Sequence, residues 1–318
     1  MIVYYKIYGP KPLQYCMNIK QRHYLAHELT AAMYGIKWPV GAQEPDYIAT
    51  MVINLPGLIK DALNKILPGR QFAVGNAFIH QKPLAHFTQR PCPVSPELGD
   101  MLVVCREKRA SGVVYNAILL QAKCVQNILH TEINKKDYHQ FILYSEWPEF
   151  KYSRADALNG QVRNIFPKTI TQGAQYLLIN KLSPNEMFTA TVDNPLNGSK
   201  LFSRTLATIM SFDGGRTFDA VNMQDDWSQM IVDLLRISMN SVFNRRVYAG
   251  IEDEDRWNGE AAFEAILYEG SQDRPIEWVN ISEEQVQPSE RFGVICIDLG
   301  VNPNRIKVDK SKKEDKTD

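Results

Sequence analysis

The amino-acid sequence predicts an α/β protein in which helices cover both faces of a mixed central sheet. Short apolar, β-branched stretches, such as residues 101–105 and 113–120, have the composition of buried strands. Longer segments carry apolar residues at helical spacing, and residues 226–244 form the clearest of these, with a wide apolar stripe. Because the two kinds of segment alternate along the chain, the pattern favours the α/β class.

The order of elements follows from local patterns along the chain. Residues 101–105 and 113–120 are separated by a polar stretch that contains Gly112, so we expect them to pair as a hairpin. Residues 35–56 contain prolines and a mixed pattern that predicts no particular layout. The other expected elements are, in chain order, helices 24–34 and 58–67, an extended segment 72–80, a helix 127–144, a loop 144–152, strands 173–179, 188–192 and 206–211, and a final strand 291–299.

Four parts are expected along the chain. Residues 1–70 are predicted to be the N-terminal helical part of the core, and residues 71–215 the core itself. Residues 216–301 are predicted to be a C-terminal extension with helical and acidic segments. Residues 302–318 are rich in Lys and Asp and have almost no apolar side chains, so they are predicted to be a disordered tail.

Composition excludes several classes of protein. The 318 residues are 44% hydrophobic and 23% charged, which is ordinary for a soluble globular protein. No apolar stretch approaches the roughly 20 residues that a membrane helix needs, and the N-terminus lacks the pattern of a secretory signal. The 5 cysteines include no CxxC pair, which favours reduced thiols over a zinc site or disulfides. We therefore expect a cytoplasmic protein that does not associate with membranes.

The net charge of zero conceals an uneven distribution of charge. Residues 252–290 carry twelve acidic side chains against two arginines, so the first 251 residues are net basic. Between residues 47 and 96 the only acid is Asp61, against five basic residues. A basic region of this kind suits a polyanion such as nucleic acid, and a solvated surface is the equally weighted alternative. The acidic segment 252–255 lacks the spacing of a calcium loop.

The expected hairpin brings polar side chains together at one end. Glu97-Leu-Gly-Asp100 precedes its first strand, and Gln121-Ala-Lys123 ends its second. Because side chains alternate along a strand, Gln121 and Lys123 share one face and Ala122 points away. In an antiparallel pair, Asp100 then lies near Gln121 and Lys123. An acid, an amide and a lysine at one sheet edge favour a site where a metal activates water. The alternative is an ordinary hairpin whose ends carry solvated polar groups.

These residues resemble the restriction-endonuclease-like nucleases of the PD-(D/E)xK superfamily, whose pattern is an acid at a strand start followed by acid-x-Lys on the next strand. Here Asp100 stands for the first half, and Gln121-Ala-Lys123 is similar to a known variant of the second. The resemblance covers roughly residues 75–180. It implies a restriction-endonuclease-like α/β/α core with a mixed central sheet.

The resemblance also implies a cofactor and its ligands. Mg²⁺, which Mn²⁺ can replace, would be held by Asp100, the side chain of Gln121 and the backbone carbonyl of Ala122, because hard cations prefer oxygen ligands. Gln121 offers a neutral oxygen where most members have a carboxylate, and Glu97 is expected to restore that negative charge. Lys123 would orient the attacking water and stabilise developing charge. Asp100, Gln121, Lys123 and Glu97 are the predicted catalytic residues.

Further residues are predicted to contact nucleic acid or metal. Gln140 and Tyr144 stand four residues apart on the expected helix, and the resemblance implies that this Gln-x-x-x-Tyr element holds DNA, although the spacing also occurs by chance. His80, Gln81 and Lys82 are candidate phosphate contacts, with a structural histidine as the favoured alternative. Glu28 or Glu44 would complete the metal site if either lies beside the core, and a surface acid is the favoured alternative for both.

The resulting expectation is a metal-dependent nuclease that hydrolyses phosphodiester bonds of DNA, with RNA left open and with a role in defence, restriction or repair. A catalytically inactive nucleic-acid-binding or scaffolding module of the same fold is the first alternative. An unrelated hydrolase is the second, but Gly-x-Ser-x-Gly, His-Glu-x-x-His and P-loop motifs are missing from the sequence. Without a P-loop, an NTP-driven step would need a partner protein, and a homo-oligomer would supply two active sites for duplex cleavage.

Overall fold

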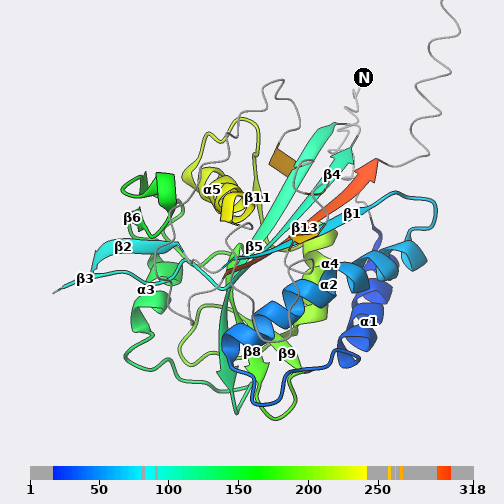
Figure 1. Cartoon of the computed structure of the whole chain (residues 1–318), viewed down its shortest axis with the longest axis horizontal. Helices are drawn as coiled ribbons and strands as arrows, with labels where there is room; N and C mark the ends of the chain where they lie inside the picture. Colours follow the sequence, from blue (N-terminus) through cyan, green and yellow to red (C-terminus); the bar gives the residue numbers. More distant parts are fainter. Residues whose placement is uncertain are drawn as a thin grey trace, which may run out of the picture.

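A mixed sheet of nine strands forms the centre of the molecule (Figure 1). This computed structural model describes residues 17–79, 83–89, 92–109, 111–241, 257–258, 262, 266–267 and 292–301. The strands follow one another across the sheet in the order β10 (Lys200–Leu201), β9 (Met187–Ala190), β8 (Ala174–Asn180), β5 (Gly112–Val125), β4 (Met101–Arg109), β13 (Phe292–Val301), β1 (Ala73–Ile79) and β12 (Trp257–Asn258), and β11 (Arg216–Phe218) pairs with β5. Within this sheet, β13 runs parallel to β4 and β8 runs parallel to β5, while the other described pairs are antiparallel.

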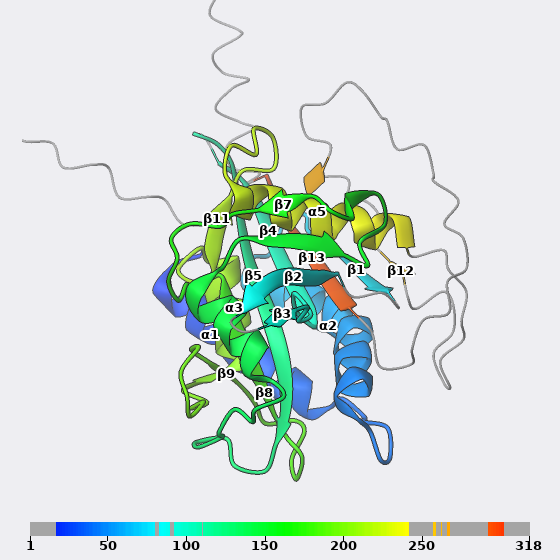
Figure 2. The same ribbon diagram turned by 90° about the vertical axis from the view of Figure 1, so that its left-hand side faces the viewer.

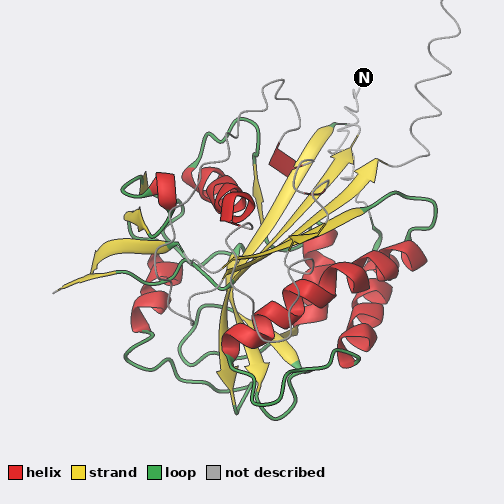
Figure 3. Ribbon diagram, viewed as in Figure 1, coloured by secondary structure: helices red, strands yellow, loops and turns green. Residues whose placement is uncertain are grey.

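Helices cover both faces of this sheet, as predicted for the α/β class (Figure 3). One face packs against α1 (Ile19–Tyr34), α2 (Glu44–Ile66) and α4 (Phe202–Met210). The other face packs against α3 (Tyr138–Glu146), α5 (Asp226–Ser241) and a second, four-stranded sheet. Figure 2 shows this smaller sheet in front of the central one. Its strands are, in order, β3 (Cys92–Val94), β2 (Leu84–Gln89), β6 (Phe150–Ser153) and β7 (Val162–Arg163), with the short 3₁₀ helix η1 (Asp156–Leu158) after β6.

Alternation along β5 divides the core into two layers. Leu119 contributes to the cluster under α3 and α5, whereas Ile118, Leu120 and Ala122 contribute to the cluster under α1, α2 and α4. This period of two is the geometry of a strand, and burial on both faces explains why the apolar run is continuous. The predicted placement of Ala122 on the face opposite Gln121 and Lys123 follows from the same alternation.

The hairpin of β4 and β5 is confirmed, with Met101 opposite Leu120, but its turn is much shorter than predicted. The polar residues from Arg106 onward continue the strand instead of leaving it. They do so because their charges are paired: Arg106 Nη1 lies 2.7 Å from Asp298 Oδ1, and Arg109 Nε lies 2.7 Å from Glu107 Oε2. The polarity of the residues near the turn therefore predicted the wrong bounds for these two strands.

Two other predictions from local pattern were wrong. Residues 206–211 were expected to form a strand, but they belong to α4, whose face with Leu206, Ile209 and Met210 is buried against the sheet. Packing of this amphipathic face outweighs the modest strand preference of its β-branched residues. The helix expected over 127–144 begins only at Tyr138, because Asn127 and Thr131 make local side-chain hydrogen bonds that favour a loop.

Residues 216–301, predicted to be a C-terminal extension, supply a central strand of the sheet. β13 lies between β4 and β1 and pairs with both along most of its length. Residues 35–56, for which no layout was predicted, contain the start of α2 at Glu44. The acidic segment 252–255 and the predicted tail 302–318 lie outside the described residues. In the part of the chain that is described, no helix has the length and apolar character to cross a bilayer.

Candidate functional site

Three polar side chains form one row across the central sheet. The register places Asp100, just before β4, opposite Gln121 on β5, and Gln121 pairs with Tyr176 on β8. The preceding row on the same face consists of Leu102, Leu119 and Ala174, all fully buried. The polar row therefore interrupts the apolar core of this face, which continues beyond it with Leu178 and Val125.

The carboxylate of Asp100 is held in one orientation. Its Oδ2 accepts a hydrogen bond from the side-chain amide of Gln121 and another, 2.7 Å long, from the backbone N–H of Ala122. The backbone N–H of Asp100 donates to the carbonyl of Leu120 at 2.8 Å, which continues the strand pairing into this residue. The structure thus places Asp100 and Gln121 side by side, as expected for the hairpin, and both are almost fully buried.

Lys123 lies one row further along the same face of β5. Its Nζ is 3.3 Å from Asp137 Oδ1, which directly precedes α3, and both side chains are about one-fifth exposed. The ion pair holds the ammonium group at the boundary between the core and the solvent. Asp137 was not predicted to belong to the site, because residues 127–137 carry apolar residues at helical spacing and were expected to be part of a helix.

The segment that carries Glu97 is packed against the predicted Gln-x-x-x-Tyr element. The hydroxyl of Tyr144 donates a 2.7 Å hydrogen bond to the carbonyl of Leu98. A Cβ atom at Gly99 would lie 2.8 Å from Leu119 Cδ1 and 3.0 Å from the Tyr144 hydroxyl, so this position requires glycine. The two motifs noted in the sequence are therefore in direct contact, and α3 fixes the backbone just before Asp100.

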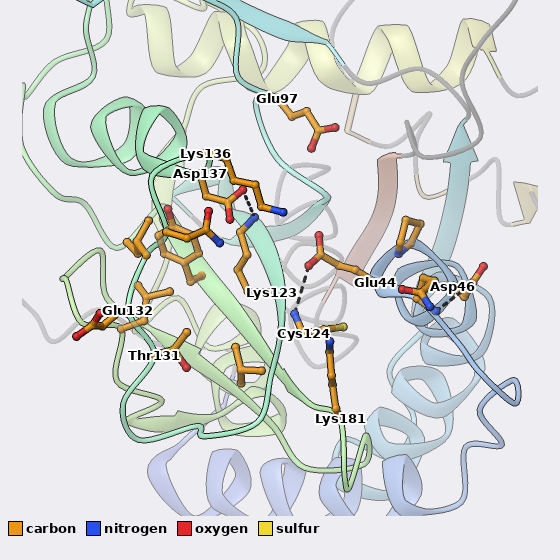
Figure 4. Close-up of a pocket in the computed structure, with 17 residues that line it drawn as sticks. Glu44, Asp46, Glu97, Lys123, Cys124, Thr131, Glu132, Lys136, Asp137 and Lys181 are labelled. Carbon is orange, nitrogen blue, oxygen red and sulfur yellow. Dashed lines mark hydrogen bonds and ion pairs between the residues drawn. The ribbon is translucent and has the colours of Figure 1, made fainter.

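A pocket of about 810 Å³ opens beside this row (Figure 4). Its wall includes Lys123, Tyr176 and Glu97, whereas Asp100 and Gln121 are not among its lining residues. The charged side chains that line it are Glu44, Asp46, Glu97, Lys123, Glu132, Lys136, Asp137 and Lys181. The pocket thus combines carboxylates with three lysines, a set suited to bind a cation together with an anion.

Glu44 and Glu28, the two acids considered as additional ligands, have different surroundings. Glu44 begins α2 and lines the pocket, where its Oε2 accepts a 3.2 Å hydrogen bond from the backbone N–H of Cys124. Glu28 lies on α1 and pairs with Lys65 Nζ at 2.7 Å, and it is not among the residues that line the pocket. The structure therefore brings Glu44, but not Glu28, to the candidate site.

Ionisation of two side chains that line the pocket is disfavoured. Burial, with a further contribution from the carboxylate of Glu44, raises the pKa of the Cys124 thiol to about 12. Burial also raises the pKa of Tyr176, and the nearby carboxylates of Asp137 and Asp100 act in the same direction. Both groups are therefore protonated at neutral pH.

Three buried polar atoms of this region have no hydrogen-bond partner among the described residues. They are Oε1 of Gln121, Oε1 of Gln140 and the hydroxyl of Tyr176. Buried polar atoms in folded proteins are nearly always paired, and an exception calls for a specific explanation. Of these three, the atoms of Gln121 and Tyr176 belong to the polar row, which makes them candidates for contact with a ligand.

The donor set at the row fits a hard divalent cation. The side-chain amide of Gln121 donates to the Asp100 carboxylate, the Oε1 of Gln121 is buried without a partner among the described residues, and Glu97 lines the neighbouring pocket. Mg²⁺ prefers such oxygens and usually needs only one or two carboxylates from the protein. Within the described ranges, no three side chains of His, Cys, Asp or Glu form a preformed metal cluster. The fit therefore rests on the chemistry of the donors.

The structure places some of the predicted residues near the site and adds others that were not predicted. Gln140 and Tyr144 lie on α3, and both are buried. His80, Gln81 and Lys82 lie outside the described residues. Tyr176, Lys136 and Lys181 line the pocket and were not predicted. The only local signal for Tyr176 was its hydroxyl group within an apolar strand. A tyrosine that belongs to the core gives the same signal.

Comparison with known proteins found no matching family model, no matching curated protein and no matching solved structure. The resemblance to the PD-(D/E)xK nucleases therefore remains a prediction from the residues of the hairpin and of α3.

Proposed function

We propose that this protein is a metal-dependent nuclease of the restriction-endonuclease-like fold that hydrolyses phosphodiester bonds of DNA, with RNA as a second substrate to be tested. The observation that carries the proposal is the gathering of Asp100, Gln121 and Lys123 at one end of the hairpin, beside a pocket with acidic and basic walls. The carboxylate of Asp100 would serve as a metal ligand, and Lys123 would supply a fixed positive charge for this reaction.

The connection around the site also supports the proposal. The antiparallel pair of β4 and β5 is followed by α3 and, after β6, η1 and β7, by β8, which runs parallel to β5. This order positions the hairpin end, the helix and the parallel strand around one pocket. It is the arrangement that the resemblance implies for an α/β/α nuclease core.

Asp100, Gln121 and Glu97 are the residues that would hold the cation. Mg²⁺, or Mn²⁺ in its place, would screen the phosphate charge and lower the pKa of a bound water. Two donors on Oδ2 fix the orientation of the Asp100 carboxylate. The backbone N–H of Ala122 is one of them, whereas a ligand role for its carbonyl stays a prediction.

Lys123 is proposed to orient the attacking water and to stabilise the charge that develops on the phosphate. Its ion pair with Asp137 keeps the ammonium at the pocket wall without burying it completely. Lys136 and Lys181 line the same pocket and would attract the polyanionic substrate. A neutral polar residue at position 123 would lack the fixed charge that this role requires.

One observation favours the second candidate, a nucleic-acid-binding module of the same fold without catalytic activity. Gln121 provides a neutral oxygen where a carboxylate is usual, and its amide is engaged by Asp100. Both side chains are nearly inaccessible, at 1% and 2% exposed, so binding a cation would require local opening. Such a module would bind DNA but show no dependence on Mg²⁺.

The test uses plasmid and linear single- and double-stranded DNA and RNA, each incubated with Mg²⁺ or with EDTA. Asp100→Ala and Lys123→Ala should each lower cleavage by at least about a hundredfold, since each removes a charge from the reacting site. Glu28→Gln is the matched control, because it neutralises an acid that is not among the residues lining the pocket. Binding without cleavage by all four proteins would favour the second candidate, and the absence of both would refute the two.

A further inference from the structure

The hydroxyl of Tyr176 differs from the hydroxyls of Tyr144 and Tyr152, two other buried tyrosines of the same core cluster. Tyr144 donates to the carbonyl of Leu98 at 2.7 Å, and Tyr152 donates to Asp233 Oδ2 at 3.0 Å. The residue Tyr176 is 0% exposed, yet its hydroxyl has no partner among the described residues. Leaving a buried hydroxyl unpaired is costly, and a phenylalanine would fill the same space without that cost.

The position of Tyr176 connects this hydroxyl to the site. Tyr176 pairs directly with Gln121 in the sheet and lies on the same face, at the end of the row that begins with Asp100. It also lines the pocket together with Lys123 and Asp137. The unpaired oxygen of Gln121 lies in the same row, so two unsatisfied polar groups occupy neighbouring strands.

The chemistry of the hydroxyl limits what it can bind. Burial and the nearby carboxylates of Asp137 and Asp100 raise the pKa of Tyr176, so the group stays protonated and acts as a hydrogen-bond donor. A protonated hydroxyl can both donate and accept a hydrogen bond, and as a donor it suits an acceptor oxygen of a ligand. Lys123, Lys136 and Lys181 line the pocket and supply positive charge for an anionic acceptor.

We infer that Tyr176 is a substrate-binding residue whose hydroxyl donates a hydrogen bond to a non-bridging oxygen of a bound phosphodiester. The class of ligand rests on the proposed function, whereas the unpaired, buried donor does not. Because the hydroxyl is buried in the free protein, a phosphate would reach it through the same local opening that exposes Asp100 and Gln121, and the hydroxyl would then fix the phosphate relative to Asp100 and Lys123. A role of this kind explains why the strand keeps a tyrosine at a position that could hold phenylalanine.

The test compares Tyr176→Phe with Tyr152→Phe. Tyr176→Phe removes only the unpaired hydroxyl, so its melting temperature should equal or exceed that of the unmodified protein. Its kcat/KM for DNA cleavage should fall by at least about tenfold, because a donor to a charged oxygen is lost. Tyr152→Phe removes a paired hydroxyl that is not among the pocket-lining residues, so it should lower the melting temperature and leave kcat/KM unchanged.

Binding provides a readout that does not depend on hydrolysis. Fluorescence anisotropy with a short fluorescein-labelled DNA, in Ca²⁺ in place of Mg²⁺, should show weaker binding by Tyr176→Phe. If the unmodified protein binds without cleaving and the variant binds at least about threefold more weakly, the inference stands and the proposed hydrolysis fails. Equal kcat/KM of two proteins that both cleave, or equal binding by the two proteins, would overturn the inference.

Two other outcomes also decide the matter. A clearly lower melting temperature for Tyr176→Phe would mean that the hydroxyl stabilises the folded protein through a partner, which contradicts a donor reserved for substrate. If the unmodified protein neither binds nor cleaves any of the nucleic acids tested, both the inference and the proposed function are refuted.

Discussion

Two buried polar clusters lie on the same face of the central sheet and differ in how completely they are paired. In the first, Asp233 Oδ2 accepts hydrogen bonds from the Tyr152 hydroxyl at 3.0 Å and from Arg163 Nε and Nη2 at 3.0 and 2.6 Å. In the second, Asp100 is also held by donors, but the neighbouring Gln121 and Tyr176 keep unpaired atoms. The first cluster joins α5 to the smaller sheet, and the second borders the pocket.

This difference separates a structural role from a functional one. A buried network whose members are paired makes the fold specific, whereas an incomplete network costs free energy that needs another justification. The guanidinium of Arg163 illustrates the first case. Burial alone would lower its pKa, but the hydrogen bond and charge of Asp233 outweigh burial and raise it. Tyr176 illustrates the second case, because its hydroxyl gains nothing comparable within the described residues.

Removing the acid of the paired cluster should have the largest effect. Asp233→Ala leaves Arg163 buried without its counter-charge, so we expect the free energy of unfolding to fall by about 3–5 kcal/mol, measured by urea denaturation. Cleavage per folded molecule should not change, since Asp233 is not among the residues lining the pocket. A loss below about 1 kcal/mol would mean that the cluster does not stabilise the folded protein as a paired network.

Cys124 reports the electrostatics of the incompletely paired region. With its pKa raised to about 12, the thiol is almost entirely neutral at pH 8, and only the thiolate reacts with iodoacetamide. Alkylation of Cys124 in the folded protein should be at least about a hundredfold slower than in urea, and should rise with pH until about pH 12. Peptide mapping by mass spectrometry measures the rate at this cysteine.

A matched variant assigns the cause of this slow reaction. Glu44→Gln removes the carboxylate whose charge, after burial, raises the Cys124 pKa most, so it should speed alkylation. Mg²⁺ bound near the same acids should also speed it in the unmodified protein, and less so in Asp100→Ala. Equal rates of Cys124 alkylation in the folded and unfolded protein would show that folding does not disfavour ionisation of this thiol.

Gly99→Ala should disturb the packing between the two sequence motifs. The added methyl group would approach Leu119 and the Tyr144 hydroxyl too closely, which should cost about 1–3 kcal/mol in unfolding experiments. Gly57→Ala is the control, because this exposed helical glycine has open space around it and should stabilise α2 slightly. Equal stability of the two variants would show that α3 does not constrain the backbone before Asp100.

The exposed ion pair of Glu28 and Lys65 should give the smallest effect. Lys65 is 63% exposed, so solvent screens the pair and Glu28→Gln should not measurably change the urea midpoint. The same variant should cleave DNA as fast as the unmodified protein. A large change in the urea midpoint or in the cleavage rate would contradict the assignment of this ion pair to the surface, away from the site.

The sequence by itself determined the α/β class and the hairpin that carries Asp100, Gln121 and Lys123. Strand alternation and antiparallel pairing are local consequences of composition, so the shared face of Gln121 and Lys123 could be worked out from spacing. The contact between Gln121 and Asp100 is the direct result. The enzymatic role of these residues stays a prediction.

Only the tertiary structure decided which other residues join them. Parallel pairing of β5 with β8 brings Tyr176 to the row, and the packing of α2 brings Glu44 to the pocket. Asp137 reaches Lys123 from a loop that was predicted to be part of a helix. The insertion of β13 between β4 and β1 likewise depends on contacts between distant parts of the chain. Such contacts are set by packing and by the need to pair backbone groups across the whole sheet, and local sequence patterns do not encode them.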